Sequence, residues 1–173
     1  MFQAHEIISQ MVRSLRQLDG WLEKAAQSAQ ARGFDLGAFM GLRLAPDQFP
    51  FERQVQIACD AVRVGVARIT GAEAPGVPDT EKTLAELRAR VAFTIDAVAQ
   101  VPASRFDGFE ARKFTTPRWN GKTMNGHDYL LEHMIPNFHF HLVTVYALLR
   151  HAGVPLGKAD YLGTLTMTAP AGA

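Results

Sequence analysis

Apolar residues recur at three- and four-residue steps in four long stretches of the chain, which is the spacing of one face of an α-helix. The first stretch ends at Gly33, the second covers residues 50–69, the third closes at Pro102, and the fourth starts near Gly126 or His127 and reaches about His151. Each such helix must bury one apolar face. The pattern therefore predicts an all-α fold, a four-helix bundle.

Two local signals bear on the helix boundaries. Asp79 and Thr80 precede the third apolar stripe and carry side chains that can cap a helix N-terminus. Pro136 lies inside the fourth stripe, where a proline ring removes one backbone N–H donor. We expect either a kink at this proline or two helices that meet at Ile135.

The helical period is lost between the third and fourth helices, from Phe109 to Asn125. Short stretches with strand character flank Trp119-Asn120-Gly121, and the Asn-Gly pair favours a tight hairpin turn. This segment is predicted to form a small β-hairpin or extended flap.

Size and composition set the class of protein. The chain has 173 residues, which suits one domain, and we expect a single bundle over residues 1–163 and a flexible tail over 164–173. The net charge of +1 gives no reason to expect nucleic acid or an anionic membrane as a partner. No signal peptide or membrane-spanning run is visible, and the single cysteine, Cys59, suits a reducing compartment, so we expect a cytoplasmic protein.

The fourth helix holds five of the six histidines. His133, Asn137 and His141 are spaced four apart, so on an unbroken helix they form one column. His141 also belongs to the apolar stripe, and its imidazole should therefore point into the bundle. A buried histidine needs a hydrogen bond or a metal ion, and the sequence leaves open whether His141 is a ligand or a satisfied core residue.

The second helix offers Cys59 on its inward stripe and Asp60 one position away. Together with Asn137 and His141, these residues are the candidate lining of a ligand pocket between helices two and four, which the flap around Trp119 would cover. The alternatives are that Cys59 is a small core residue and that Asp60 faces solvent.

Two blocks of sequence resemble a known family. The first block consists of Leu44 to Pro50 and Gln54 to Asp60. The second block, which is the more specific one, consists of Pro136 to His141 and Tyr146 to Lys158. Both are similar to domain of unknown function 1993, a branch of the DinB/YfiT-like superfamily. The resemblance covers nearly the whole chain, and it implies a four-helix bundle that is commonly a homodimer.

The resemblance also implies what a metal site would require. Better-known members of the superfamily are metal-dependent enzymes, and their metal is typically held by one histidine on helix two and a His-x-x-x-His pair on the last helix. Here that pair falls on Asn137 and His141, and the helix-two position falls near Cys59 or Asp60. No histidine lies between His5 and His127, so the three-histidine site is not intact. A divalent zinc or nickel ion would depend on a degenerate set made of His141, Asn137 and either Cys59 or Asp60.

Two functions therefore compete. In the first, the bundle binds a small molecule between helices two and four and is an enzyme if His141 serves as a general base or as one ligand of the degenerate metal site. In the second, the protein is a non-catalytic homodimer whose buried polar residues are structural. The sequence does not decide between them, and it identifies no substrate.

Overall fold

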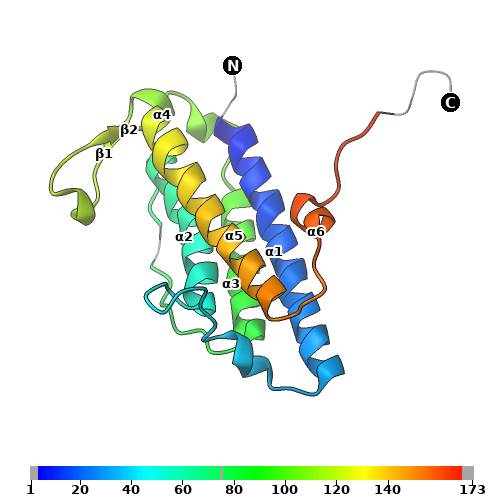
Figure 1. The fold of residues 1–173 in the computed structure, drawn as a ribbon. Coiled ribbons are helices and arrows are strands. Elements are labelled where there is room, and N and C mark those ends of the chain that lie inside the picture. Colours follow the sequence, from blue (N-terminus) through cyan, green and yellow to red (C-terminus); the bar gives the residue numbers. More distant parts are fainter. Residues whose placement is uncertain (1–3, 75, 169–173) are drawn as a thin grey trace.

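Four long helices form the body of the protein, as the apolar periodicity predicts. The structure is a computed structural model that describes residues 4–74 and 76–168. The four helices are α1 (Ala4–Arg32), α2 (Phe51–Thr70), α3 (Leu84–Ala99) and α5 (Ile135–His151). Figure 1 shows them side by side with their axes roughly aligned. The prediction of an all-α four-helix bundle is confirmed.

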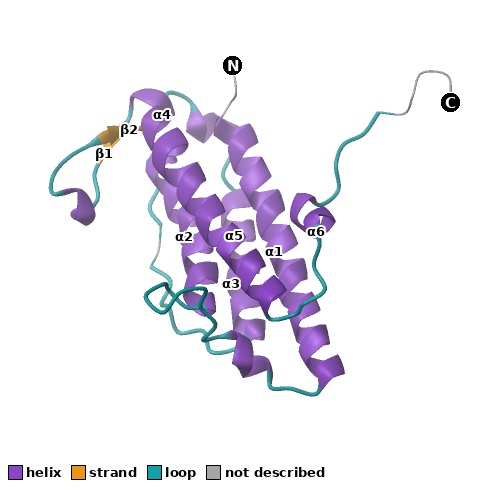
Figure 2. Ribbon diagram, in the orientation of Figure 1, coloured by secondary structure: helices purple, strands orange, loops and turns teal. Residues whose placement is uncertain are grey.

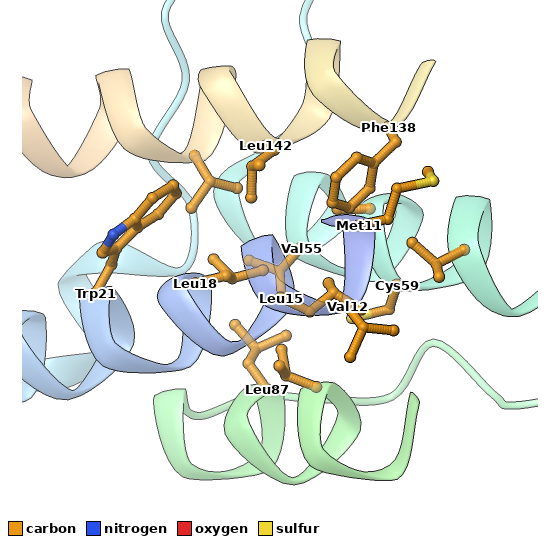
Figure 3. Packing of buried hydrophobic residues seen from close by; sticks show 14 of the residues in the cluster. Met11, Val12, Leu15, Leu18, Trp21, Val55, Cys59, Leu87, Phe138 and Leu142 are labelled. Carbon is orange, nitrogen blue, oxygen red and sulfur yellow. The ribbon is translucent and has the colours of Figure 1, made fainter. Parts of the chain in front are cut away.

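The core lies between these helices. Leu15, Leu18 and Leu22 of α1 are fully buried, and they belong to one continuous cluster with residues of the other three helices, such as Leu87 of α3 and Phe138 of α5. Figure 3 shows side chains from all four helices meeting in this cluster. Burial of such side chains contributes about 1.5–3 kcal/mol each, which makes the cluster the main source of stability.

The boundaries of α2 and α3 follow from local chemistry. Gly71 ends α2 in the left-handed conformation, with φ of 70°. Thr83, and not Asp79 or Thr80, caps α3, because its side chain accepts from the Glu86 N–H while Glu86 reaches back to the Thr83 N–H. The predicted cap was therefore misplaced by three to four residues.

The last helix runs past Pro136 without a break. It is built from α4 (Gly126–Asp128), a π-helical segment called η5 (Tyr129–Met134) and α5. The Ile135 N–H donates to the Leu130 carbonyl, five residues back, just before the proline. A π-turn is wider than an α-turn, and it leaves room for a residue that has no N–H to donate. Two helical segments, η5 and α5, thus meet at Ile135, as one of the two predicted outcomes has it, and the chain stays helical through the junction.

A short antiparallel hairpin separates α3 from the last helix (Figure 2). Its strands are β1 (Lys113–Phe114) and β2 (Met124–Asn125), with Phe114 opposite Met124. The connection contains a 3₁₀ turn, η4 (Pro117–Trp119), followed by Asn120 and Gly121, which both have positive φ. The predicted hairpin is confirmed, although the Asn-Gly pair lies within a longer loop and does not join the strands directly.

Shorter elements complete the chain. Three further 3₁₀ turns, η1 (Leu36–Phe39), η2 (Ala103–Phe106) and η3 (Phe109–Ala111), lie in the connections, and α6 (Lys158–Leu162) follows α5. Beyond α6, residues 164–168 have no regular secondary structure, and the Thr164 carbonyl accepts from Nη2 of Arg13 on α1 at 2.5 Å. The remainder of the predicted tail, 169–173, lies outside the described residues. Among the helices of the described ranges, none is long and apolar enough to cross a membrane.

Candidate functional site

A cleft of about 570 Å³ lies between α2, the η5–α5 helix and the flap. The α2 residues that line it recur at steps of three or four, apart from the adjacent pair Asp60 and Ala61, and therefore form one face of that helix. They are Arg53, Ile57, Asp60, Ala61, Val64 and Arg68. The opposite wall includes His133, Asn137 and His141, so the predicted column does face one cavity. Trp119 of the flap also lines it.

His141 is the most constrained polar residue of the cleft. Its side chain is only 7% exposed, and its Nδ1 lies 2.6 Å from Oε1 of Gln54. The Gln54 amide is itself oriented, because its Nε2 donates to the Phe49 carbonyl at 2.8 Å. Gln54 Oε1 is thus an acceptor, and His141 Nδ1 must carry the proton. The lone pair of the imidazole is left on Nε2, and the structure shows no partner for that atom among the residues it describes.

The charge state of His141 follows from its surroundings. Burial, and to a lesser degree the charge of the nearby Arg53 guanidinium, lower the pKa of the imidazole to about 4. His141 is therefore neutral at pH 7. A neutral imidazole with a fixed tautomer can accept a hydrogen bond or a proton at Nε2, and it does not act as a cation.

His133 lies two turns before His141 and belongs to an aromatic wall. Its ring stacks on Tyr129 with centroids 5.1 Å apart, and the Trp119 ring meets it edge-on at 5.7 Å. Its Nδ1 is buried without a hydrogen-bond partner. Burial lowers the pKa of His133, and the charge of Arg68 adds to this effect. This part of the cleft is consequently aromatic, with a neutral imidazole in it.

Asp60 lines the cleft, but its charge is already compensated. Its Oδ1 lies 2.9 Å from Nη2 of Arg63 and 3.0 Å from Nη2 of Arg90. The Arg90 side chain is 2% exposed, so this part of the contact is buried. A carboxylate held by two guanidinium groups is a poor candidate for a mobile catalytic base, and its role is first of all to neutralise the arginines behind it.

Cys59 does not line the cleft, in contrast to the pocket predicted from the sequence. It is fully buried and lies among the core side chains (Figure 3), where it is hydrogen-bonded to the Thr94 side chain. Burial raises the pKa of its thiol to about 12. Neighbouring residues on a helix point about 100° apart. Since Asp60 faces the cleft, Cys59 is turned toward the bundle core.

These positions do not fit the metal site that the resemblance implies. Cys59 lies in the core, and Asp60 is bound by two arginines. Within residues 4–74 and 76–168, no three His, Cys, Asp or Glu residues come together in a way that could hold a metal ion. His141 and Asn137 alone provide at most two ligands, whereas a catalytic zinc site usually has three from the protein.

Sequence reasoning missed two features of the cleft. The first is Gln54, which orients His141; its position three residues after Phe51, a stripe residue, was the available signal that it faces inward. The second is the group of arginines, of which Arg53 and Arg68 share one face of α2 with Asp60. Arg118 of the flap also lines the cleft. Its position depends on how the flap packs on the helices, and the spacing of residues along the chain does not predict this.

Comparison with known proteins agrees with this architecture. The sequence model of the family described as "Domain of unknown function (DUF1993)" matches residues 4–162. Among solved structures, the chain is similar to a DinB family member protein from Shewanella denitrificans, with 42% identity, a TM-score of 0.91, and coverage of 94% of this chain and 93% of the other. A search of curated proteins gave no match.

Proposed function

The chain belongs to the DUF1993 family, a DinB-like group of helical proteins, and from this premise we propose that its cleft between α2 and α5 binds a small organic molecule. In this proposal the ligand presents a hydroxyl, thiol or amine hydrogen to Nε2 of His141. The family description assigns no activity, so the argument depends on the site itself.

The pairing of Gln54 with His141 carries the proposal. Gln54 fixes one tautomer of a neutral, nearly buried imidazole, and the free Nε2 lone pair is then the acceptor that a ligand can reach. The same lone pair can take a proton from a bound hydroxyl or thiol, which is the chemistry of a general base. A histidine with a purely structural role would be expected to use both ring nitrogens in hydrogen bonds.

The cleft has the dimensions and composition of a ligand site. Its volume of about 570 Å³ falls within the range typical of small-molecule pockets. Seven lining residues are aromatic or aliphatic, among them Trp119, Tyr129 and Val64, and the other eight are polar or charged. Such a mixture supplies apolar contact area, while His141 and Asn137 can fix the orientation of the ligand.

A fragment screen with a matched pair of variants tests the proposal. His141→Asn keeps a donor for Gln54 Oε1 and removes the acceptor at Nε2, and His139→Asn makes the same change on the same helix outside the cleft lining. We expect ligand-detected NMR to find fragments that bind the wild-type protein and the His139 variant and lose about tenfold or more in affinity with His141→Asn. Equal binding to all three proteins, or no binding to any, would contradict the proposal.

One observation favours the second candidate function, a non-catalytic homodimer. Two apolar side chains that lie three positions apart on α5, Phe140 and Val143, are 58% and 46% exposed. A second copy of the chain would cover such a surface. Light scattering on wild-type protein and on Phe140→Asp tests this alternative: a dimer that dissociates in the variant supports it, and a wild-type monomer at micromolar concentration contradicts it.

A further inference from the structure

The charges behind the cleft compensate one another. The Arg53 guanidinium is paired with Asp79, and Arg90 contacts Asp60, Asp79 and Glu81 at 2.9–3.0 Å. Arg63 contacts Asp60 as well. This group contains three arginines and three carboxylates, so it carries no net charge of its own.

Two further arginines line the same cleft without a carboxylate. In the described parts of the chain, Arg68 and Arg118 take part in no ion pair. Arg68 donates from Nη1 to the Tyr129 hydroxyl at 3.1 Å, and its guanidinium carbon lies 5.7 Å from the centre of the Tyr129 ring. This contact positions Arg68 and uses one of its five N–H donors. The lowered pKa of His133 is consistent with an uncompensated positive charge beside it.

Arg68 and the flap lie at one end of an elongated cleft, since Arg68 and Trp119, the neighbour of Arg118 in the chain, both contact Tyr129; His141 lies at the other end. The last helix is antiparallel to α2. Gln54 contacts His141, whereas Arg68, which comes later on α2, contacts Tyr129, which comes before His141. Along the axis of α2, Asp60 lies eight residues, or about 12 Å, from Arg68, and Gln54 lies still further from Arg68. A ligand that reaches both ends must therefore be extended.

The surface between the two ends is suited to an apolar chain. Ile57, Ala61 and Val64 of α2 line the cleft on one side, and Met134 lines it on the other. Trp119 lies beside Arg118 on the flap, where its ring can cover the ligand. An arginine pair with an adjacent apolar channel fits a molecule that combines an oxyanion with a hydrocarbon body.

We propose that the cleft selects an elongated organic acid, whose carboxylate or phosphate group is bound by Arg68 and Arg118 and whose apolar body extends toward His141. This inference rests on the proposed function and adds the class of ligand. Guanidinium groups bind carboxylates and phosphates through the same charge-assisted hydrogen bonds, so the two kinds of acid share one recognition chemistry.

The two tryptophans allow a direct test in the intact protein. The indole N–H of Trp119 reports on the cleft, and that of Trp21, which donates to the Asp160 carbonyl at 3.0 Å, is a reference outside the cleft lining. Titration of ¹⁵N-tryptophan-labelled protein uses three probes with the same chain: octanoate, octyl phosphate and the neutral octanamide. We expect the acids to shift the Trp119 signal and leave Trp21 in place, with octanamide binding about tenfold or more weakly.

Charge-removing variants complete the experiment. Arg118→Gln, at an exposed position on the flap, should raise the Kd of the acids about tenfold, and Arg68→Gln should do the same. Lys122→Gln removes the same charge from the same flap outside the cleft lining, and it should leave the Kd within about twofold, as expected for a distant, screened charge. Tighter binding of octyl phosphate than of octanoate would identify the ligand as a phosphate ester, and the reverse order would identify it as a carboxylic acid.

Two results would overturn the proposal. If octanamide binds as tightly as octanoate and Arg118→Gln changes nothing, the cleft binds small molecules without selecting acids, and only the class of ligand is wrong. If none of the three probes shifts the Trp119 signal, selection of acids is refuted, while the fragment screen with His141→Asn tests small-molecule binding separately.

Discussion

The buried, neutral state of His141 makes the stability of the protein depend on pH in a calculable way. The pKa of a histidine is about 6.5 in an unfolded chain, and burial lowers that of His141 to about 4. Above pH 6.5 both states are neutral, and the residue has no effect on the pH dependence. Between pH 6.5 and 4 the unfolded state takes up a proton that the folded state excludes. The free energy of unfolding must therefore fall as the pH falls through this window.

The size of the effect follows from the two pKa values. The difference between a pKa of about 6.5 in the unfolded chain and about 4 in the folded protein corresponds to about 3 kcal/mol in the free energy of unfolding once the pH is well below 4. About 2–3 kcal/mol of this stability should already be lost at pH 4.5. Other groups contribute to the same window, since burial also lowers the pKa of His133 and His139. The contribution of His141 must accordingly be measured as a difference between two proteins.

Urea denaturation of wild-type protein and His141→Asn at pH 7.5 and 4.5 isolates that contribution. Contributions from the other titrating groups cancel in the difference, and asparagine does not titrate. At pH 7.5 the variant should be the less stable protein, because it lacks part of a packed side chain. By pH 4.5 the difference should have moved in favour of the variant by about 2–3 kcal/mol.

Two results would refute this reasoning. A stability difference between the two proteins that is the same at pH 7.5 and pH 4.5 would mean that His141 has the same pKa in the folded and unfolded chain. A direct NMR titration in which the His141 ring signals of the folded protein change near pH 6.5 would show the same thing.

Three further predictions concern packing and charge. Gly126→Ala should destabilise the protein by about 2 kcal/mol or more in thermal or urea unfolding, because a Cβ there would lie 1.9 Å from the Phe109 carbonyl oxygen; Gly20→Ala, with open space around it inside α1, should not destabilise it. Cys59 should not react with a disulfide reagent at pH 8 until the protein unfolds, since its thiol is buried and has a pKa of about 12; fast reaction of native protein would contradict this. Arg90→Met should cost about 3–5 kcal/mol of stability, because it leaves carboxylates without their partner; a loss below about 1 kcal/mol would show that water already solvates them.

The fold could be predicted because it depends on patterns that are local in the chain. Each long helix carries its own apolar stripe, and glycines such as Gly71 end helices through their own backbone conformation. The inward position of His141 followed from the same stripe, and its burial bears this out. The π-helical segment before Pro136 was not foreseen, because its width depends on how the last helix packs as well as on the proline.

The chemistry of the cleft depends on contacts between distant residues, and for these the sequence offers weaker signals. Gln54 and His141 are 87 positions apart, and nothing in either local pattern names the other as its partner. The sequence puts Cys59 on the inward stripe and Asp60 one position off it, and about 100° of rotation around the helix axis separates the two side chains. The stripe alone does not show which of them lines the cleft. Arg118 reaches the cleft because the flap packs against η5, where the Trp119 ring meets those of Tyr129 and His133, an arrangement set by tertiary packing.

In the proposed complex, the polar groups at the two ends of the cleft bind different parts of one ligand. At the Gln54 end, burial keeps His141 neutral, and the Arg53 guanidinium near it is already paired with Asp79, so an anionic group there would meet an uncharged acceptor and a compensated cation. At the flap end, Arg68 and Arg118 offer donors with positive charge and no compensating carboxylate in the described chain. An acid bound in the opposite direction would place its charge beside the neutral His141 and leave Arg68 and Arg118 without a carboxylate partner. In the proposed complex, the oxyanion would therefore lie at the flap and the hydrogen-bond donor of the ligand at His141.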